Sequence, residues 1–355
     1  MKDMIDTPTK IREGEELDVS TLETFLKDEI KGLSGPFDVK QFPSGFSNLT
    51  YQITAGDREL ILRRPPFGTK AKSAHDMGRE FNILTALYSV FPYCPKPYVY
   101  SEDESIIGSS FYVMEKLQGI ILRKNLPKGL SFTPQEARTL SESSLDIQHQ
   151  LHSVDYSAIG LENFGKPQGY VRRQVEGWSK RYRNARTADA PDFEEVMAWL
   201  DKQQPPDCEK PGIIHNDYKL DNLVLDSENP TKIVGVLDWE MATLGDPLMD
   251  LGSSLAYWVQ KSDSAEMIGM RSLPTHLDGF LTREELVERY LEKAGLKIDS
   301  FDFYLVFGMF RLAGIAQQIY YRYFHGQTRD KRFAMLVFAV GILEKEARKI
   351  IKKGV

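Results

Sequence analysis

A segment between positions 212 and 240 contains the side chains best suited to chemistry. Two short apolar stretches flank a polar turn, and this pattern predicts a β-hairpin. In a hairpin, the start of the first strand and the end of the second lie at the same end, and the loop before the first strand leads into that end. We therefore expect one small volume to hold four polar residues, His215, Asp217, Asn222 and Asp238.

These four side chains suit phosphoryl transfer. The reaction needs a divalent metal to neutralise the phosphates, oxygen ligands for the metal, and a carboxylate that orients the attacking hydroxyl and accepts its proton. Magnesium prefers hard oxygen ligands and usually takes only one or two carboxylates from the protein. Asn222 and Asp238 therefore fit the metal, and Asp217 fits the base. His215 is expected to brace the loop through hydrogen bonds rather than to bind metal.

The order of the four residues resembles the catalytic loop of kinase-like phosphotransferases. His215 and Asp217, followed by Asn222, match the pattern HxDxxxxN. Asp238, within the sequence LDWE, stands where protein kinases have the aspartate of their DFG motif. An HxD tripeptide alone is more often a turn with a capping Asp, and LDWE alone could end an ordinary strand. Several motifs in the right order favour the kinase interpretation.

The residues after Asp238 carry a narrower resemblance. LDWE is followed by the sequence GDP at 245–247 and then by Asp250, which resembles the aminoglycoside phosphotransferase and choline kinase group. More narrowly, the chain is similar to the kinase-like domains fused to acyl-CoA dehydrogenases, and this resemblance covers positions 38 to 324. Asp250 is expected to give structural support, by capping a helix that starts after GDP.

The resemblance implies a two-lobed, protein-kinase-like α+β fold. Residues 20–116 would form a nucleotide-binding lobe with a small antiparallel sheet and one helix. Residues 117–355 would form a larger helical lobe that contains the hairpin, catalyses the reaction and binds the acceptor. Residues 1–19 are expected to be a mobile leader. Periodicity predicts strands at 39–42, 49–54, 59–63 and 110–115, and helices at 20–30, 74–88, 133–152, 170–186, 193–203, 282–294, 302–324 and 330–353.

The N-terminal lobe of such a fold binds ATP. A turn with Gly45, Ser47 and Asn48 lies between two predicted strands and is suited to cover phosphates, although an ordinary hairpin turn fits equally well. No GxxxxGK[ST] sequence occurs, which argues against a P-loop enzyme.

The strand at 110–115 resembles the linker strand beside the adenine pocket of kinases. Met114, Glu115 and Leu117 would then meet the base near this strand, chiefly through backbone groups. A buried edge strand without a ligand is the plainer alternative.

A charged pair is predicted between a strand and a helix. Kinases position the phosphates with a strand lysine and a helix glutamate, and Arg63 in ILRR occupies the aligned strand position. Glu80 lies on the apolar face of its helix, where a carboxylate needs a cationic partner. We expect an Arg63–Glu80 pair that contacts ATP. Arginine and lysine are not interchangeable, and a solvated strand end is the alternative for Arg63.

The expected acceptor is a small molecule with a hydroxyl group. Only seven residues separate Asp238 from Asp246, which leaves no long activation segment for a protein substrate. The helix at 170–186 has one basic face that could meet an anionic substrate such as a coenzyme A thioester, although a solvated face is the commoner reason for this pattern. Candidate substrate contacts are Arg173, Arg311 and Tyr320.

Three functions follow from these patterns. The first is an ATP- and magnesium-dependent kinase for a small hydroxylated metabolite, with hydroxyacyl-CoA compounds suggested by the acyl-CoA dehydrogenase resemblance. The second is an aminoglycoside kinase, against which the basic helix argues because such enzymes carry acidic pockets. The third is a pseudokinase that binds nucleotide or acts as a scaffold. Asp217, Asn222 and Asp238 argue against the third function, whereas Arg63 keeps it open.

The composition excludes several other classes. The 355 residues carry a net charge of -6, which disfavours general binding to nucleic acid. Cys94 and Cys208 form no CxxC pair, so a cytoplasmic location is expected. The N-terminal residues show no secretory signal, and the longest apolar run, 334–343, is half of what a membrane span needs. None of these patterns specifies an oligomeric state.

Overall fold

The computed structural model describes residues 7–43, 48–66 and 76–353. The chain divides into two compact units. One consists of Met1–Ile121, Ser157–Leu161 and Asn222–Ala242, and the other consists of the remaining segments. A small antiparallel sheet in the first unit and a mostly helical second unit confirm the predicted α+β class.

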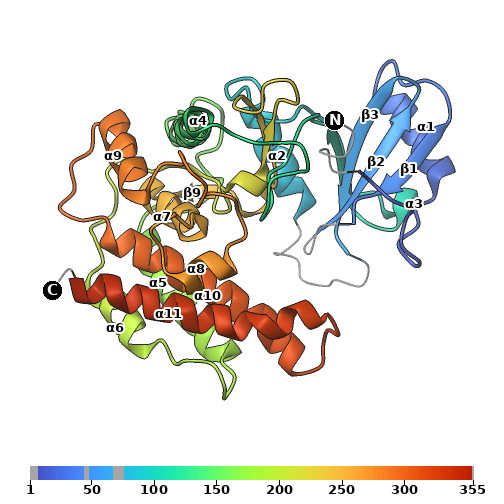
Figure 1. The fold of residues 1–355 in the computed structure, drawn as a ribbon. Coiled ribbons are helices and arrows are strands. Elements are labelled where there is room, and N and C mark those ends of the chain that lie inside the picture. Colours follow the sequence, from blue (N-terminus) through green and yellow to red (C-terminus); the bar gives the residue numbers. More distant parts are fainter. Residues whose placement is uncertain (1–6, 44–47, 67–75, 354–355) are drawn as a thin grey trace. The chain divides into compact units, whose positions relative to one another are not determined.

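The first unit is built on a five-stranded antiparallel sheet (Figure 1). In β1 (Phe37–Gln41) partly buried residues alternate with exposed ones up to the buried Gln41, whereas β2 (Leu49–Ala55) and β3 (Arg58–Arg64) are largely buried. A two-residue turn at Gly56, where φ is +61°, joins the second strand to the third. In spatial order the strands are β1 (Phe37–Gln41), β2 (Leu49–Ala55), β3 (Arg58–Arg64), β5 (Phe111–Glu115) and β4 (Pro97–Ser101).

In the described part of the first unit, three helices accompany this sheet. α1 (Val19–Glu29) buries Leu22 and Leu26, and Asp18 caps its N-terminus. The others are α2 (Met77–Leu87) and the short α3 (Glu104–Ile107).

Part of the predicted leader packs on the sheet. The backbone of Thr9 pairs with that of Gln41, and the hydroxyl of Tyr51 donates to the carbonyl of Glu15 at 2.8 Å. The residues from 7 to 18 therefore border the sheet, although their sequence shows no strand pattern.

The predicted hairpin also belongs to the first unit. It consists of β7 (Leu223–Leu225) and β8 (Ile233–Val236), and the short 3-10 turn η3 (Trp239–Met241) follows it. Ile120 pairs with Leu225 through two backbone hydrogen bonds of 2.8 Å. A Cβ on Gly119 would lie 2.1 Å from the carbonyl oxygen of Leu225, so only glycine allows this approach of the two backbones.

The second unit is a helical assembly around α10 (Asp302–Phe324), which contacts α5, α6, α7 and α11 (Figure 1). α10 and α7 meet closely, because a Cβ on Gly308 would lie 2.1 Å from the carbonyl oxygen of Gly252. The other helices are α4 (Pro134–His152), α5 (Tyr170–Ala185), α6 (Glu194–Lys202), α7 (Pro247–Tyr257), α8 (Ala265–Met270), α9 (Arg283–Ala294) and α11 (Leu336–Lys353), with the 3-10 turns η2 (Leu220–Asn222) and η4 (Lys331–Met335).

A two-stranded ribbon completes the second unit. β6 (Gly212–Ile214) pairs antiparallel with β9 (Thr243–Gly245) and leads into the loop that contains Asp217. Among the described residues, no helix combines the length and the apolarity that crossing a membrane requires.

Candidate active site

The end of the hairpin brings two predicted metal ligands together. The amide of Leu237 donates to the carbonyl of Asn222 at 2.8 Å, so Asn222 and Asp238 lie at the same end of β7 and β8, as predicted. Asp238 has φ +67° and ψ +63°, in the left-handed region that aspartate tolerates better than most residues. Such backbone conformations are concentrated at functional sites.

Arg63 joins this end of the hairpin to the sheet. Its Nη1 lies 2.5 Å from Oε1 of Glu80, which confirms the predicted ion pair, and its Nη2 lies 3.0 Å from Oδ1 of Asp238. The Arg63 side chain is 9% exposed and that of Glu80 only 1%. Burial alone would lower the pKa of Arg63, but the Glu80 carboxylate and its neighbours outweigh burial and hold that pKa well above its usual value. Arg63 is therefore a permanent cation and not a solvated strand end.

Glu240 adds a third carboxylate to this cluster. Its Oε2 lies 3.8 Å from Nη2 of Arg63 and accepts a hydrogen bond of 2.8 Å from Nδ2 of the buried Asn48. One guanidinium thus faces the carboxylates of Glu80, Asp238 and Glu240.

This donor set fits magnesium. The carboxylates of Asp238 and Glu240 and the side-chain amide of Asn222 offer hard oxygens, which are the ligands that magnesium prefers. The Asp238 side chain is 36% exposed, so a metal can reach it. The described residues contain no group of three or more His, Cys, Asp or Glu side chains arranged to hold a metal by themselves. Magnesium in phosphotransferases is commonly shared between one or two carboxylates and the substrate phosphates.

The remaining predicted ATP contacts also lie in the first unit. Met114 and Glu115 end β5, where they pair with β3, and the Glu115 carboxylate accepts from the amide of Lys96 at 3.1 Å. The Leu117 side chain lies directly against Gly235 of β8, where a Cβ would come within 2.1 Å of it. Asn48 immediately precedes β2, whereas Gly45 and Ser47 lie outside the described residues.

The predicted base lies in the second unit, on the loop after β6. Oδ2 of Asp217 is 2.6 Å from Nζ of Lys219, and the amide of Asp217 donates to Nδ1 of His215 at 3.3 Å. His215 is fully buried, which agrees with a bracing role. Asn216, between them, has φ +64°, another left-handed residue next to a proposed catalytic group. That all four predicted residues share one volume stays a prediction.

Asp250 holds this loop rather than capping a helix. Asp246 is the N-cap of α7, whereas the fully buried Asp250, one turn later, accepts from the amides of His215 at 3.1 Å and Asn216 at 2.7 Å. Nε2 of His152 lies 3.0 Å from the same carboxylate. Burial alone would raise the pKa of Asp250, but the hydrogen bonds from His152 and the loop amides hold it below its usual value. The predicted capping role was therefore wrong. Asp250 instead supports the loop after β6 by accepting hydrogen bonds from its backbone amides.

The three candidate substrate contacts have partners inside the second unit. The buried Arg311 donates to the carbonyl of Asn216 at 2.7 Å, so it braces the loop. The hydroxyl of Tyr320 donates to Asp189 at 2.6 Å, and the Arg173 guanidinium donates to nearby backbone carbonyls. Their roles in acceptor binding stay predictions.

The predicted basic face of α5 is partly neutralised. Arg172 pairs with Glu176 at 2.8 Å within the helix, and Arg183 pairs with Glu194 of α6 at 2.6 Å. These exposed pairs lower the positive potential that the sequence pattern indicated.

Sequence reasoning missed two charged residues next to the motifs. Lys219 stands two positions after Asp217, and Glu240 stands two positions after Asp238. Lys219 lies inside the HxDxxxxN pattern and Glu240 inside LDWE, so their spacing from a candidate catalytic or metal-binding carboxylate was the signal that could have found them.

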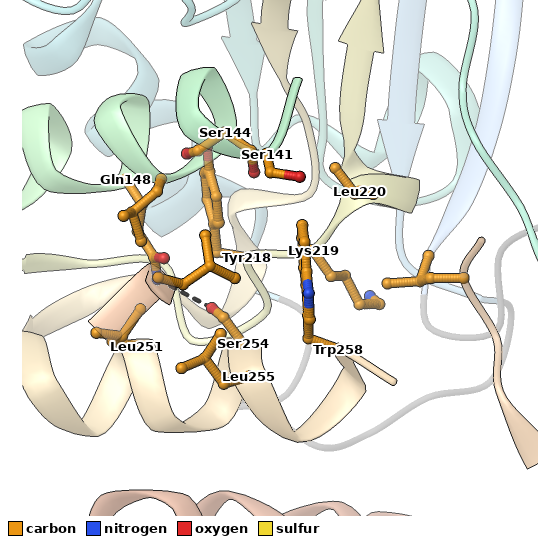
Figure 2. Close-up of a pocket in the computed structure, with 13 residues that line it drawn as sticks. Ser141, Ser144, Gln148, Tyr218, Lys219, Leu220, Leu251, Ser254, Leu255 and Trp258 are labelled. Atoms are coloured by element: carbon orange, nitrogen blue, oxygen red, sulfur yellow. Dashed lines mark hydrogen bonds between the residues drawn. The ribbon is translucent and has the colours of Figure 1, made fainter. Parts of the chain in front are cut away.

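A small cavity borders the loop on its α4 and α7 side. Its volume is about 20 Å³, which is room for one water molecule. Figure 2 shows Gln148 of α4 hydrogen-bonded to Ser254 of α7 at 2.9 Å beside it. This space is too small for an acceptor and is a packing feature of the loop's support.

Comparisons with known proteins agree with this arrangement. A model of the phosphotransferase enzyme family matches residues 38–294. The chain is 38% identical over 310 residues to acyl-CoA dehydrogenase family member 10 of Mus musculus, covering 85% of this chain and 28% of that protein. It is 34% identical over 322 residues to human acyl-CoA dehydrogenase family member 11, covering 88% of this chain and 40% of that protein. The chain thus spans less than half the length of these curated relatives.

Solved structures show the same fold. A candidate aminoglycoside phosphotransferase from Ralstonia eutropha JMP134 has a TM-score of 0.81 and 31% identity, covering 95% of this chain and 99% of that one. Choline kinase from Cryptosporidium parvum has a TM-score of 0.62 at 11% identity, covering 95% of this chain and 97% of that one, which shows the fold alone. The kinase-like fold expected from the motifs is thereby confirmed. Because the model of the phosphotransferase enzyme family matches most of this sequence, the chain belongs to that family.

Proposed function

We propose that this protein is an ATP- and magnesium-dependent kinase that transfers the γ-phosphate to a hydroxyl of a small molecule. The observation that carries the proposal is that Asn222 and Asp238 lie at one end of the hairpin, where the buried Arg63 contacts Asp238 at 3.0 Å and is held by Glu80 at 2.5 Å.

Each residue has a distinct role in the proposed reaction. Bound magnesium would neutralise the phosphate charge during transfer. Asn222 and Asp238 would hold that ion through their oxygens. Arg63, kept in place by Glu80, would direct its fixed positive charge to the phosphates. Asp217 would orient the acceptor hydroxyl and take its proton as the new oxygen–phosphorus bond forms, while the bond from the γ-phosphorus to the bridging oxygen breaks and ADP leaves.

For the acceptor we propose a hydroxyacyl-CoA type of metabolite. The support comes from the relatives, which are named as acyl-CoA dehydrogenase family members and contain this region as part of a longer chain. The basic face of α5 adds little support to this acceptor, because Arg172 and Arg183 are paired with glutamates. An aminoglycoside acceptor is the second candidate, because the Ralstonia protein at 31% identity is described as a candidate aminoglycoside phosphotransferase. We also propose a cytoplasmic location, in keeping with two free cysteines.

An acceptor panel tests the function. ATP consumption would be measured with hydroxyacyl-CoA esters, the matching free hydroxy acids, choline and aminoglycosides, each with magnesium and with a chelator. We expect magnesium-dependent turnover with a hydroxyacyl-CoA ester and phosphate on the hydroxyl of the product. Turnover with aminoglycosides alone would replace the acceptor proposal. Tight nucleotide binding with no turnover on any acceptor would favour the pseudokinase.

Removing the carboxylate of Asp238 is expected to abolish most of the increase in ATP affinity that magnesium gives. In Asp238→Ala, the magnesium-dependent gain in ATP affinity should fall by about 100-fold, and in Asn222→Ala by about 10-fold, because a carboxylate offers the metal more charge than an amide. Calorimetric titration of ATP with and without magnesium measures both. Asp226→Ala, at the far turn of the same hairpin, is the matched control and should leave the gain unchanged. An unchanged metal dependence in Asp238→Ala would place the metal elsewhere.

A further inference from the structure

Tyr112 of β5 lies beside the Arg63–Glu80 pair in the first unit. Tyr112 and Arg63 of β3 are directly opposite each other in the sheet, so their side chains leave the same face. Tyr112 is fully buried, and its ring packs against that of Phe81, the residue after Glu80 in α2, with ring centres 6.3 Å apart. The hydroxyl comes close enough to the Glu80 carboxylate for the two groups to shift each other's pKa.

Several buried polar atoms of this cluster lack a hydrogen-bond partner in the part of the chain that the structure describes. They are Nε of Arg63, Oε2 of Glu80 and the hydroxyl of Tyr112. Buried polar groups in folded proteins nearly always have a partner, and buried tyrosine hydroxyls usually find one. A carboxylate oxygen only accepts, a guanidinium nitrogen only donates, and a phenol hydroxyl does both. The hydroxyl of Tyr112 is therefore the group that suits a place between the other two.

Electrostatic interactions keep this hydroxyl a donor. Burial raises the pKa of Tyr112 well above its usual value, and the negative charge of Glu80 adds to the effect, so the phenol keeps its proton. Burial also raises the pKa of Glu80, whereas the charge of Arg63 and the Tyr112 hydroxyl oppose that rise. The hydroxyl thus favours the charged form of Glu80, which is the form that pairs with Arg63.

A donor at Oε2 would also determine which way the Glu80 carboxylate faces. Arg63 binds Oε1 of Glu80 with Nη1 at 2.5 Å and reaches Oδ1 of Asp238 with Nη2 at 3.0 Å. The last side-chain torsion of a glutamate is soft, so a carboxylate held at one oxygen can turn and carry the guanidinium with it. A carboxylate held at both oxygens cannot.

We propose that Tyr112 is a positioning residue for Arg63: its hydroxyl donates to Oε2 of Glu80 and so keeps the guanidinium directed to the nucleotide phosphates. The hydrogen bond concerns the first unit alone, whereas its effect on the nucleotide rests on the proposed function. Tyr112→Phe removes one oxygen atom and keeps the ring, so it is the direct test.

A double-mutant cycle with Glu80 tests the inference by two measurements. In chemical denaturation, Tyr112→Phe should raise the equilibrium constant for unfolding by about 10- to 100-fold, as expected for a hydrogen bond to a charged group. In calorimetric titration with ATP and magnesium, it should lower the affinity by about 10-fold, as when a group that orients a ligand-binding side chain is lost. In the Glu80→Met background, Tyr112→Phe should change each quantity by less than about twofold, because no carboxylate is left to hold.

Tyr100→Phe is the matched control. Tyr100 of β4 is opposite Tyr112 in the sheet and stacks on the same Phe81, but its hydroxyl donates to the exposed Glu102 at 2.7 Å. The control should change the unfolding constant and the ATP affinity by less than about twofold, as exposed polar contacts contribute little.

A second background keeps the test decisive if Glu80→Met does not fold. Glu80→Gln retains an oxygen but no charge, so Tyr112→Phe should have a smaller effect there than in the unchanged protein. Equal effects of Tyr112→Phe with and without the Glu80 carboxylate would overturn the inference, as would an unchanged unfolding constant. Normal ATP affinity in Tyr112→Phe would overturn the positioning role. If the unchanged protein does not bind ATP, the proposed function fails instead, and the unfolding cycle still tests the hydrogen bond.

Discussion

Asp217→Asn is expected to fold, to bind ATP with magnesium as the unchanged protein does, and to lose about 10²- to 10⁴-fold in kcat. The change keeps the size and shape of the side chain but removes its ability to accept the acceptor's proton. Lys219 keeps Asp221 as a counter-charge, so the loop should not be distorted by an unpaired buried cation. The buried carboxylate of Asp250 still binds the amides of His215 and Asn216.

Three measurements check this expectation. Steady-state kinetics with the acceptor found in the panel gives kcat, calorimetry gives ATP affinity, and thermal unfolding reports the fold. Asp201→Asn, on an exposed residue of α6, is the matched control and should behave as the unchanged protein. A variant at position 217 with normal kcat would show that the proton of the acceptor leaves by another route.

Breaking the Arg63–Glu80 pair is expected to produce the largest change in stability. Removal of one partner from a buried ion pair typically costs about 3 to 5 kcal/mol, because the other charge is left without compensation. Glu80→Gln should lie at the low end of this range, since Arg63 keeps Asp238 at 3.0 Å. Arg63→Met should cost more, because Glu80 and Asp238 both lose their cation. Both variants should also raise KM for ATP.

The double mutant tests whether the two residues are coupled. Arg63→Met/Glu80→Gln should lose less free energy of unfolding than the two single variants added together, because the second change removes the stranded charge. Chemical denaturation of all four proteins gives the coupling. The exposed pair of Arg138 and Glu142 is the matched control, with about 0 to 1 kcal/mol expected. Additive losses would show that Arg63 and Glu80 contribute independently.

A lysine at position 63 should separate stability from catalysis. Arg63→Lys keeps one positive charge beside Glu80, so the free energy of unfolding should change little. Arg63 contacts Glu80 with Nη1 and Asp238 with Nη2, using two nitrogens of one planar guanidinium. A lysine has a single ammonium nitrogen and lacks this planar geometry. We therefore expect a larger effect on kcat than on stability.

Local patterns in the sequence were sufficient for most elements and for the central motifs. The alternation in β2 and the helical spacing of α2 each depend on one element's own period, so they can be read without tertiary information. The approach of Asn222 to Asp238 follows from the short hairpin Leu223–Val236, whose register its turn determines. Arg63 and Glu80 could be paired from sequence because a carboxylate on an apolar helix face requires a cation.

Short elements without a period of their own were not predicted. β4 begins at a proline and contains a bulge, and β9 has only three residues, so neither shows an alternation that can be recognised. Their strand conformation depends on the neighbours with which they pair.

Only the tertiary structure determined which distant charges meet. Asp238 and Glu240 join Arg63 across more than 170 residues, and Asp250 reaches back to the amide of Asn216 across 34. These contacts follow no periodicity, because they depend on how separate elements pack and on which buried polar groups still need a partner. The sequence by itself therefore determined the kinds of residue available for phosphoryl transfer and their order. The packing determined that Asp250 supports the loop, that the basic face of α5 is partly neutralised, that Lys219 pairs with Asp217, and that Glu240 joins Asp238 beside Arg63.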